Sequence, residues 1–193
     1  TGIGSLPAIS GANLTSLTAG NLTGSLPAIN GSALTGVGGG ITEADQWRVG
    51  SGFSNDASPI TSNWERNDTT GFSKIGTGMS ESSGVFSFPS TGIYLIKFGY
   101  IVGGYGDNRN TTESLKITTN NSSYTTAAVA MCSIKNVASL TYQMASSTFI
   151  FDVTNTSTHK CRFHFTKVGD SVNYSGASDY NENFHEFIRL GDT

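Results

Sequence analysis

The sequence has little charge, few cysteines and no long hydrophobic run. Only 13% of its 193 residues are charged, and the formal net charge of −3 comes without any cluster of Lys or Arg. A nucleic-acid-binding surface needs a basic patch, so we expect no nucleic-acid partner. No stretch approaches the roughly 20 apolar residues of a membrane-spanning helix, and the first residues lack the charged head and apolar core of a signal peptide. We therefore expect no membrane insertion, and a chain that is a processed fragment or leaves its cell outside the secretory route.

Cys132 and Cys161 are the only cysteines, which is too few for a disulfide scaffold. Both lie in stretches with the composition of strands, and we expect two buried free thiols. Lys and Glu are scarce, whereas Thr, Phe, Tyr, Val and Ile are common, which disfavours long helices and favours strands. The composition therefore predicts an all-β protein.

A repeat occupies the first part of the chain. Residues 4–15 have the sequence GSLPAISGANLT, which returns as GSLPAINGSALT at residues 24–35. Each unit is small and lacks aromatic residues, so its thin aliphatic stripe cannot offset a backbone entropy cost of about 1–2 kcal/mol per ordered residue. We predict a β-repeat fibre stem over residues 1–37, in which identical chains pack together to form a shared core. A flexible Gly/Ser/Thr linker is the alternative.

A glycine-rich hinge is expected at residues 38–45, and the first aromatic residue, Trp47, comes just after it. Residues 46–193 then show short apolar stretches separated by polar turns, the spacing of a β-sandwich or jelly roll. We expect this segment to form a globular head. Its clearest strands are predicted at residues 85–88, 93–102, 113–119, 128–134, 148–153, 161–168 and 184–190.

Alternation along these strands assigns their faces. The even-numbered residues from Tyr94 to Val102 are aromatic or aliphatic, so we expect them to face the core. Residues 161, 163 and 165 alternate with polar residues, which predicts one buried and one wet face. Residues 148–153 are apolar on both faces, which favours a second cover from outside the sandwich. We expect a subunit interface that includes Phe149, Ile150, Phe151 and Phe187.

The segment FSFPSTGIYLIKF at residues 86–98 resembles the central signature of the complement C1q and tumour necrosis factor superfamily. Phe86, Gly92, Tyr94 and Phe98 match that signature, whereas Ile96 replaces an aromatic residue. The segment FHEFIRL at residues 184–190 is similar to the closing strand of the family. The resemblance covers about residues 46–193 and implies a C1q/TNF-like jelly roll of ten strands that assembles into a homotrimer, often on a stem. The repeats themselves look like those that precede the tips of bacteriophage tail fibres.

The sequence offers no catalytic, cofactor or metal site. No nucleophile elbow, phosphate loop or HExxH motif is present. His159 and Cys161 would point to one face of a strand and His164 to the other, so the three cannot bind one ion. Loop carboxylates could form a glycosidase pair or a calcium site, but surface carboxylates without such a role are the simpler interpretation, and we expect no enzyme. Those carboxylates are Asp56, Glu65, Asp68, Asp107 and Glu113.

Loops at the end of the head remote from the stem combine Tyr with Asn, Asp and Arg, a mixture that binds sugars or protein surfaces. Solvated loops without a ligand are the alternative. The candidate receptor-binding residues are Tyr105, Asp107, Asn108, Arg109, Tyr174, Asp179, Tyr180, Asn181 and Glu182.

These features predict the tip of a homotrimeric viral fibre or spike, exposed on a virion, most simply a bacteriophage. Its partners would be its own copies, a host cell-surface glycan or protein, and other fibre or tail proteins. Three linked binding sites would let weak contacts act together. One alternative is a structural knob that only aligns the trimer, and another is a carbohydrate-active enzyme on a fibre scaffold. The alternative to a location on a virion is an extracellular one.

Overall fold

The computed structural model describes residues 40–193, except residues 136, 138, 170 and 171. The chain divides into two units, Thr1–Val37 and Gly38–Thr193. The predicted stem over residues 1–37 lies outside the described residues. No helix in the described part of the chain is long and apolar enough to cross a membrane.

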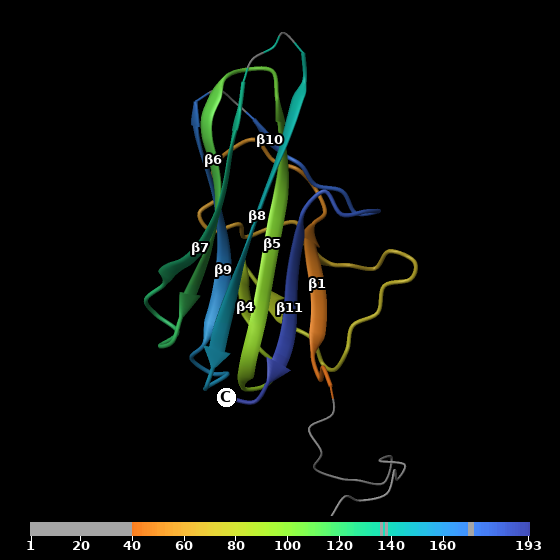
Figure 1. The fold of residues 1–193 in the computed structure, drawn as a ribbon, viewed down its shortest axis with the longest axis vertical. Helices are drawn as coiled ribbons and strands as arrows, with labels where there is room; N and C mark the ends of the chain where they lie inside the picture. Colours follow the sequence, from red (N-terminus) through yellow and green to blue (C-terminus); the bar gives the residue numbers. More distant parts are fainter. Residues whose placement is uncertain (1–39, 136, 138, 170–171) are drawn as a thin grey trace, which may run out of the picture. The chain divides into compact units, whose positions relative to one another are not determined.

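The head is a sandwich of two antiparallel sheets (Figure 1). In sheet A, β5 pairs with β8 along one edge and with β10 and β11 along the other, and β1 joins β11 to β2. Sheet A is formed by β1 (Ala44–Val49), β2 (Trp64–Arg66), β5 (Gly92–Gly104), β8 (Thr141–Val153), β10 (Asn173–Tyr174) and β11 (Phe184–Gly191). Sheet B has the order β3-β4-β9-β6-β7. Its strands are β3 (Ser80–Ser82), β4 (Val85–Ser87), β6 (Asn108–Thr118), β7 (Thr125–Ile134) and β9 (Lys160–Gly169).

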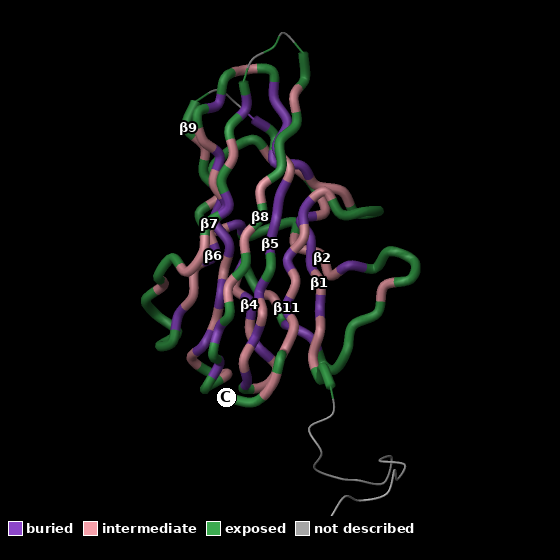
Figure 2. Tube along the Cα trace, viewed as in Figure 1, coloured by how far each residue is buried: buried purple, intermediate pink, exposed green. Residues whose placement is uncertain are grey.

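The core lies between the two sheets and is dominated by aromatic rings. The even-numbered side chains from Tyr94 to Val102 are at most 1% exposed, which confirms the predicted inner face of β5. Phe163 of β9 packs edge-on against Phe86 of β4, with the ring centroids 5.7 Å apart. Edge-to-face contacts of this kind add to the stabilisation from buried area. Figure 2 shows these buried positions alternating with more exposed ones along the long strands.

All the predicted strands are present, and all-β architecture is confirmed. The structure adds β1, β2, β3 and β10, so the described residues form eleven strands where the resemblance implied ten. The first of these, β1, begins at Ala44, two residues before the predicted start of the head. Its alternation is hidden because two of its buried positions are the charged residues Asp45 and Arg48.

The strand register defines two ends of the sandwich. Both β1 and β5 are antiparallel to β11, so they run in the same direction. The start of β1 therefore lies at the end where β5 begins, and the connection from β5 to β6 lies at the opposite end, named here the distal end (Figure 1). The loop between β5 and β6 at the distal end therefore begins and ends on two of the longest strands, which fix the positions of its two ends.

Candidate functional site

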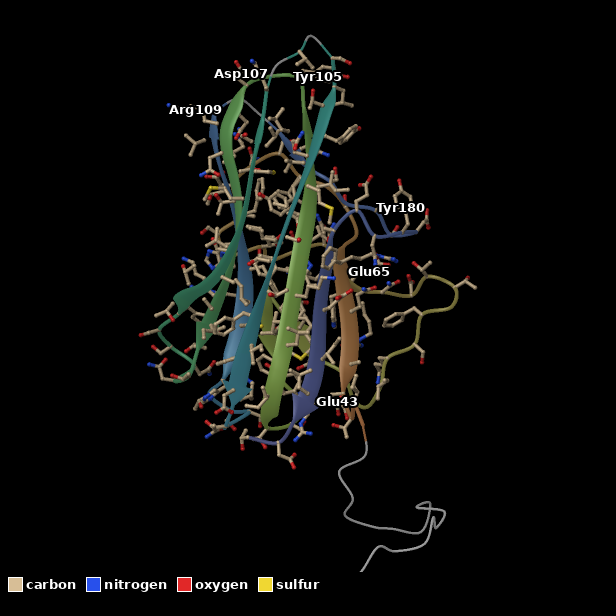
Figure 3. The ribbon with its side chains drawn as sticks, viewed as in Figure 1. Glu43, Glu65, Tyr105, Asp107, Arg109 and Tyr180 are labelled. Carbon is tan, nitrogen blue, oxygen red and sulfur yellow. The ribbon has the colours of Figure 1, made fainter. Side chains whose placement is uncertain are left out.

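Three of the predicted receptor-binding residues lie at the distal end (Figure 3). Tyr105, Asp107 and Arg109 are exposed there, and the side chain of Tyr105 is 65% exposed. Asn108 is 1% exposed, so its assignment as a receptor contact is wrong. The reason is its place at the first position of β6, where it is paired with both neighbouring strands, β7 and β9.

A hollow of about 280 Å³ opens beside these residues. Two cationic side chains, Arg109 and Lys135, and the carboxylate of Asp107 contribute to its lining. Asn108, Ser133 and Ile134 complete the lining, so the hollow can accept a small polar group by hydrogen bonds and charge. The hollow is lined by Asp107, Asn108, Arg109, Ser133, Ile134 and Lys135.

A second group of predicted residues lies elsewhere, in the loop between β10 and β11. Figure 3 shows Tyr180 well below Tyr105, on the side of the head near Glu65. Two hydrogen bonds hold this loop against β1 and the segment after β2. The Thr69 hydroxyl donates to the Asp179 carbonyl oxygen at 3.0 Å, and the Asn181 amide donates to Gln46 Oε1 at 2.9 Å.

The prediction of one apical cluster is therefore wrong. The candidates form a distal group and a lateral group, the latter containing Asp179, Tyr180, Asn181 and Glu182. The first three of the lateral group are exposed, and Glu182 is half-buried. No local pattern in the sequence indicates this separation, because it depends on where a long loop folds back onto another strand.

Tyr174 is a core residue, and its assignment to the receptor site is also wrong. Its side chain is fully buried, stacked on Phe53 at 4.7 Å and on Tyr100 at 5.6 Å between ring centroids. Its hydroxyl donates to the Glu113 carboxylate at 3.4 Å. Burial and the negative charge of Glu113 raise the pKa of the Tyr174 hydroxyl well above its usual value. The sequence pattern does not distinguish Tyr174 from a loop residue, because β10 contains only two residues.

A hollow of about 380 Å³ lies beside the lateral group, between the segment after β2 and the β10–β11 loop. Its lining is mostly polar and includes three carboxylates and two threonines. Because it is open and lined mainly by polar side chains, its chemistry suits a hydroxyl-rich ligand. The lining residues are Glu65, Asp68, Thr69, Thr70, Ser178 and Asp179.

Arg48 holds the wall of this lateral hollow together. Its side chain is fully buried, and Nη2 lies 2.7 Å from Glu65 Oε1 and 2.6 Å from Asp68 Oδ1. The same nitrogen donates to the carbonyl oxygen of Ser178. Nη1 donates to Asn67 and Thr69. Glu65 and Asp68 therefore compensate a buried cation, which explains these two carboxylates without a glycosidase or calcium role.

Glu113 is a buried structural carboxylate. Its Oε1 atom lies 2.7 Å from His185 Nε2, and both side chains are fully buried. Tyr174 supplies a further hydrogen bond from the opposite sheet. The predicted pairing of Asp107 with Glu113 is excluded by location, since Asp107 is exposed at the distal end and Glu113 faces the core.

Two of the four predicted interface residues belong to the core of the chain itself. Phe151 is 4% exposed and Phe187 1% exposed, so neither is available to another subunit. Phe149 is half-buried against the core, and Ile150 is 59% exposed. The prediction is wrong for Phe151 and Phe187 because the apolar pattern does not show which face of each strand the sandwich itself covers, and both side chains lie on the covered face.

The two cysteines lie on strands that do not touch. Cys132 is on β7 and Cys161 on β9, with β6 between them in sheet B. Both are free thiols, although only Cys161 is fully buried and Cys132 is partly exposed. Within the described residues, no group of three or more His, Cys, Asp or Glu side chains could hold a metal ion.

No family model matches the sequence, and no curated protein matches it either. The solved structures do give matches. Eiger TNF from S. frugiperda has 16% sequence identity and a TM-score of 0.56, over 78% of this chain and 93% of that one. Murine APRIL at pH 8.5 has 13% identity and a TM-score of 0.54, over 77% of this chain and 98% of that one. The head has a TNF-like jelly-roll fold. At these identities the likeness establishes the fold and leaves function to be argued from the surfaces of this chain.

Proposed function

We propose that this chain is the tip of a homotrimeric fibre that attaches a virion, most simply a bacteriophage, to the surface of its host. The jelly-roll head would bind a host glycan or protein, and residues 1–37 would form the stem that joins it to the other fibre proteins. No catalytic role is proposed, because Glu65 and Asp68 are paired with Arg48, and Glu113 is paired with His185.

One observation carries the trimer: the outer face of sheet A exposes large apolar side chains. Tyr142, Met144 and Ile150 of β8 are 59%, 57% and 59% exposed. Cross-strand pairing places Ile150 opposite Leu95, and Leu95 opposite Ile188, so the apolar surface continues over three strands. Contiguous apolar surface of this kind marks a contact with another protein.

Further copies of this chain are the occupants that we favour. The outer face of sheet B is more mixed: Thr112, Ser114 and Lys116 of β6 are polar, whereas Val129 and Met131 of β7 are exposed beside them. The apolar surface of sheet A runs over three strands, and a chain that must align identical stems can cover this surface with its own copies. The TNF-like jelly roll supports the same arrangement through the resemblance that the sequence shows to a family of trimers.

The trimer is tested by sedimentation at micromolar concentration. The variant Met144→Lys/Ile150→Lys should be a folded monomer, because both side chains are exposed in the isolated chain and such changes cost within about 0.5 kcal/mol each. The variant Thr126→Lys/Thr166→Lys places the same charges at exposed positions of sheet B and should remain a trimer. A parent chain that sediments as a monomer would refute the architecture.

The receptor-binding role is tested on an array of surface glycans, with the parent trimer scored for both binding and cleavage. Binding that weakens sharply in the monomeric variant would support a receptor-binding head, because three linked sites multiply weak contacts. A trimer that binds no glycan and no host cell would favour the structural knob. Cleaved glycan would favour the enzyme.

A further inference from the structure

The ion pairs that the Arg and Lys side chains of the head form are distributed unevenly between the two sheets. In the described residues, the Arg and Lys side chains that form ion pairs lie on sheet A or its flanks: Arg48, Arg66, Lys97 and Arg189. On sheet B, Lys116 of β6 and Lys160 and Arg162 of β9 form no ion pair with a described carboxylate. Lys160 instead donates to the Thr156 carbonyl oxygen at 2.7 Å.

These three cations share the outer face of sheet B. Lys116 is directly opposite Arg162 in the β6–β9 ladder, and Lys160 is two residues before Arg162 on the same face. Like charges in directly opposed positions destabilise a sheet, so their neighbours would be expected to include a carboxylate. The strands of sheet B contain two carboxylate side chains. Glu113 is buried, and Glu81 of β3 accepts a hydrogen bond from the Gly84 backbone amide.

The side chains around the pair leave polar groups without partners. Arg162 lies over the Tyr124 ring, with its guanidinium carbon 3.9 Å from the ring centroid, and its Nε atom is buried without a hydrogen bond. His164, next on the same face, is only 5% exposed. Its Nδ1 atom is 2.6 Å from the Ser58 hydroxyl, whereas Nε2 is buried and has no partner.

We propose that this surface, the sheet B cation patch formed by Lys116, Lys160 and Arg162 with Tyr124 and His164, binds the sulfate or carboxylate groups of an anionic host-surface glycan. The proposal rests on the proposed function and names the chemical class of its receptor. Guanidinium and ammonium groups bind such anions through charge-assisted hydrogen bonds. The patch would stay open in the trimer, because the face covered by other copies is that of sheet A.

A glycan fits the patch better than a nucleic acid does. Proteins that bind single strands stack bases on aromatic rings, and Tyr124 already lies against Arg162. Ser114, Thr112 and Thr166 place hydroxyl groups on the same face, where they can bond to sugar hydroxyls.

The test uses the full chain and four polymers: dextran sulfate, polygalacturonate, neutral dextran and an oligo-dT strand. Isothermal titration should show binding to one or both of the acidic glycans and none to neutral dextran. The sulfate and carboxylate arms distinguish the two sources of negative charge. The variant Lys116→Gln/Arg162→Gln should bind at least about tenfold more weakly, since two charge-assisted contacts are lost.

The control Lys74→Glu lowers the net charge by the same two units at an exposed side chain outside the patch and should bind within about twofold of the parent, which separates the patch from net charge. Equal loss in the control, equal binding of neutral dextran, or oligo-dT binding as tight as that of the best acidic glycan would overturn the proposal. Sedimentation of the same samples distinguishes failure of the trimer proposal from failure of the patch proposal. A monomeric parent that still binds acidic glycan refutes the trimer alone. A trimeric parent that binds no acidic glycan refutes the patch alone.

Discussion

His164 should make the stability of the head depend on pH in the mildly acidic range. Burial, and then repulsion from Lys116 and Arg162, lower the pKa of its imidazole from 6.5 to about 4. In the unfolded chain the same imidazole takes up a proton near its ordinary pKa. Between these two values the unfolded state therefore binds more protons, and the free energy of unfolding falls as the pH is lowered from about 6.5 to about 4.

The size of the effect follows from the shift. A difference of about 2.5 units, at 1.36 kcal/mol per unit, corresponds to about 3 kcal/mol across the whole window. Solvent screens part of the repulsion from the two half-exposed cations, so we expect roughly 1–3 kcal/mol. The effect is specific to His164 if it disappears in His164→Gln, whose amide can still bond to the Ser58 hydroxyl.

Chemical denaturation of the parent and His164→Gln at successive pH values measures this directly. The difference between their free energies of unfolding should change by roughly 1–3 kcal/mol from pH 6.5 to pH 4, in favour of the variant at low pH. In Lys116→Gln/Arg162→Gln the slope should be smaller but not zero, because burial is the largest cause of the shift. Parallel pH curves for the parent and His164→Gln would refute the reasoning.

The remaining predictions concern the core and the loops. Arg48→Met should lower the free energy of unfolding by roughly 1–3 kcal/mol in urea denaturation, because it leaves the buried Asn67 side-chain oxygen and the part-buried Glu65 carboxylate without their donor. Tyr174→Ala should cost about 3–5 kcal/mol, whereas Tyr180→Ala, at a side chain that is 60% exposed, should stay within about 0.5 kcal/mol. Cys161 should resist a thiol reagent until the head unfolds, because burial raises the pKa of its thiol, while the partly exposed Cys132 should react in the native state. Mass spectrometry without reductant should find both thiols free.

The fold was predictable because strand alternation is a local signal. The inner face of β5 and the aromatic face of β9 follow from residues two apart in the sequence, and both are confirmed by burial. The short strands were missed for the opposite reason. A strand such as β2, with three half-buried residues, shows no alternation that a pattern can detect.

The candidate receptor site was only partly predictable, because a loop residue and a core residue look alike when both stand among Gly, Ser and Asn. Tyr180 and Tyr174 are six residues apart in such a stretch, yet one is exposed and the other fully buried. What separates them is a two-residue ladder with β5, and no local pattern encodes a pairing so short. The buried Arg48 was missed similarly, since its carboxylate partners come from segments 17 and 20 residues away.

The sheet B cation patch depends on strand pairing that no local sequence pattern predicts. Alternation alone could place Arg162 on the outer face of β9 and Lys116 on the face of β6 opposite Leu115. Alternation could not predict that the two side chains lie directly opposite each other, because this depends on the register between strands that are far apart in the sequence. A slip of one residue would turn the core aromatic residues of β9 outward, so the register is fixed by burial of Phe163 and Phe165. The juxtaposition of two cations is thus a consequence of packing on the opposite face, and its persistence without a carboxylate is what makes an external anion the natural partner.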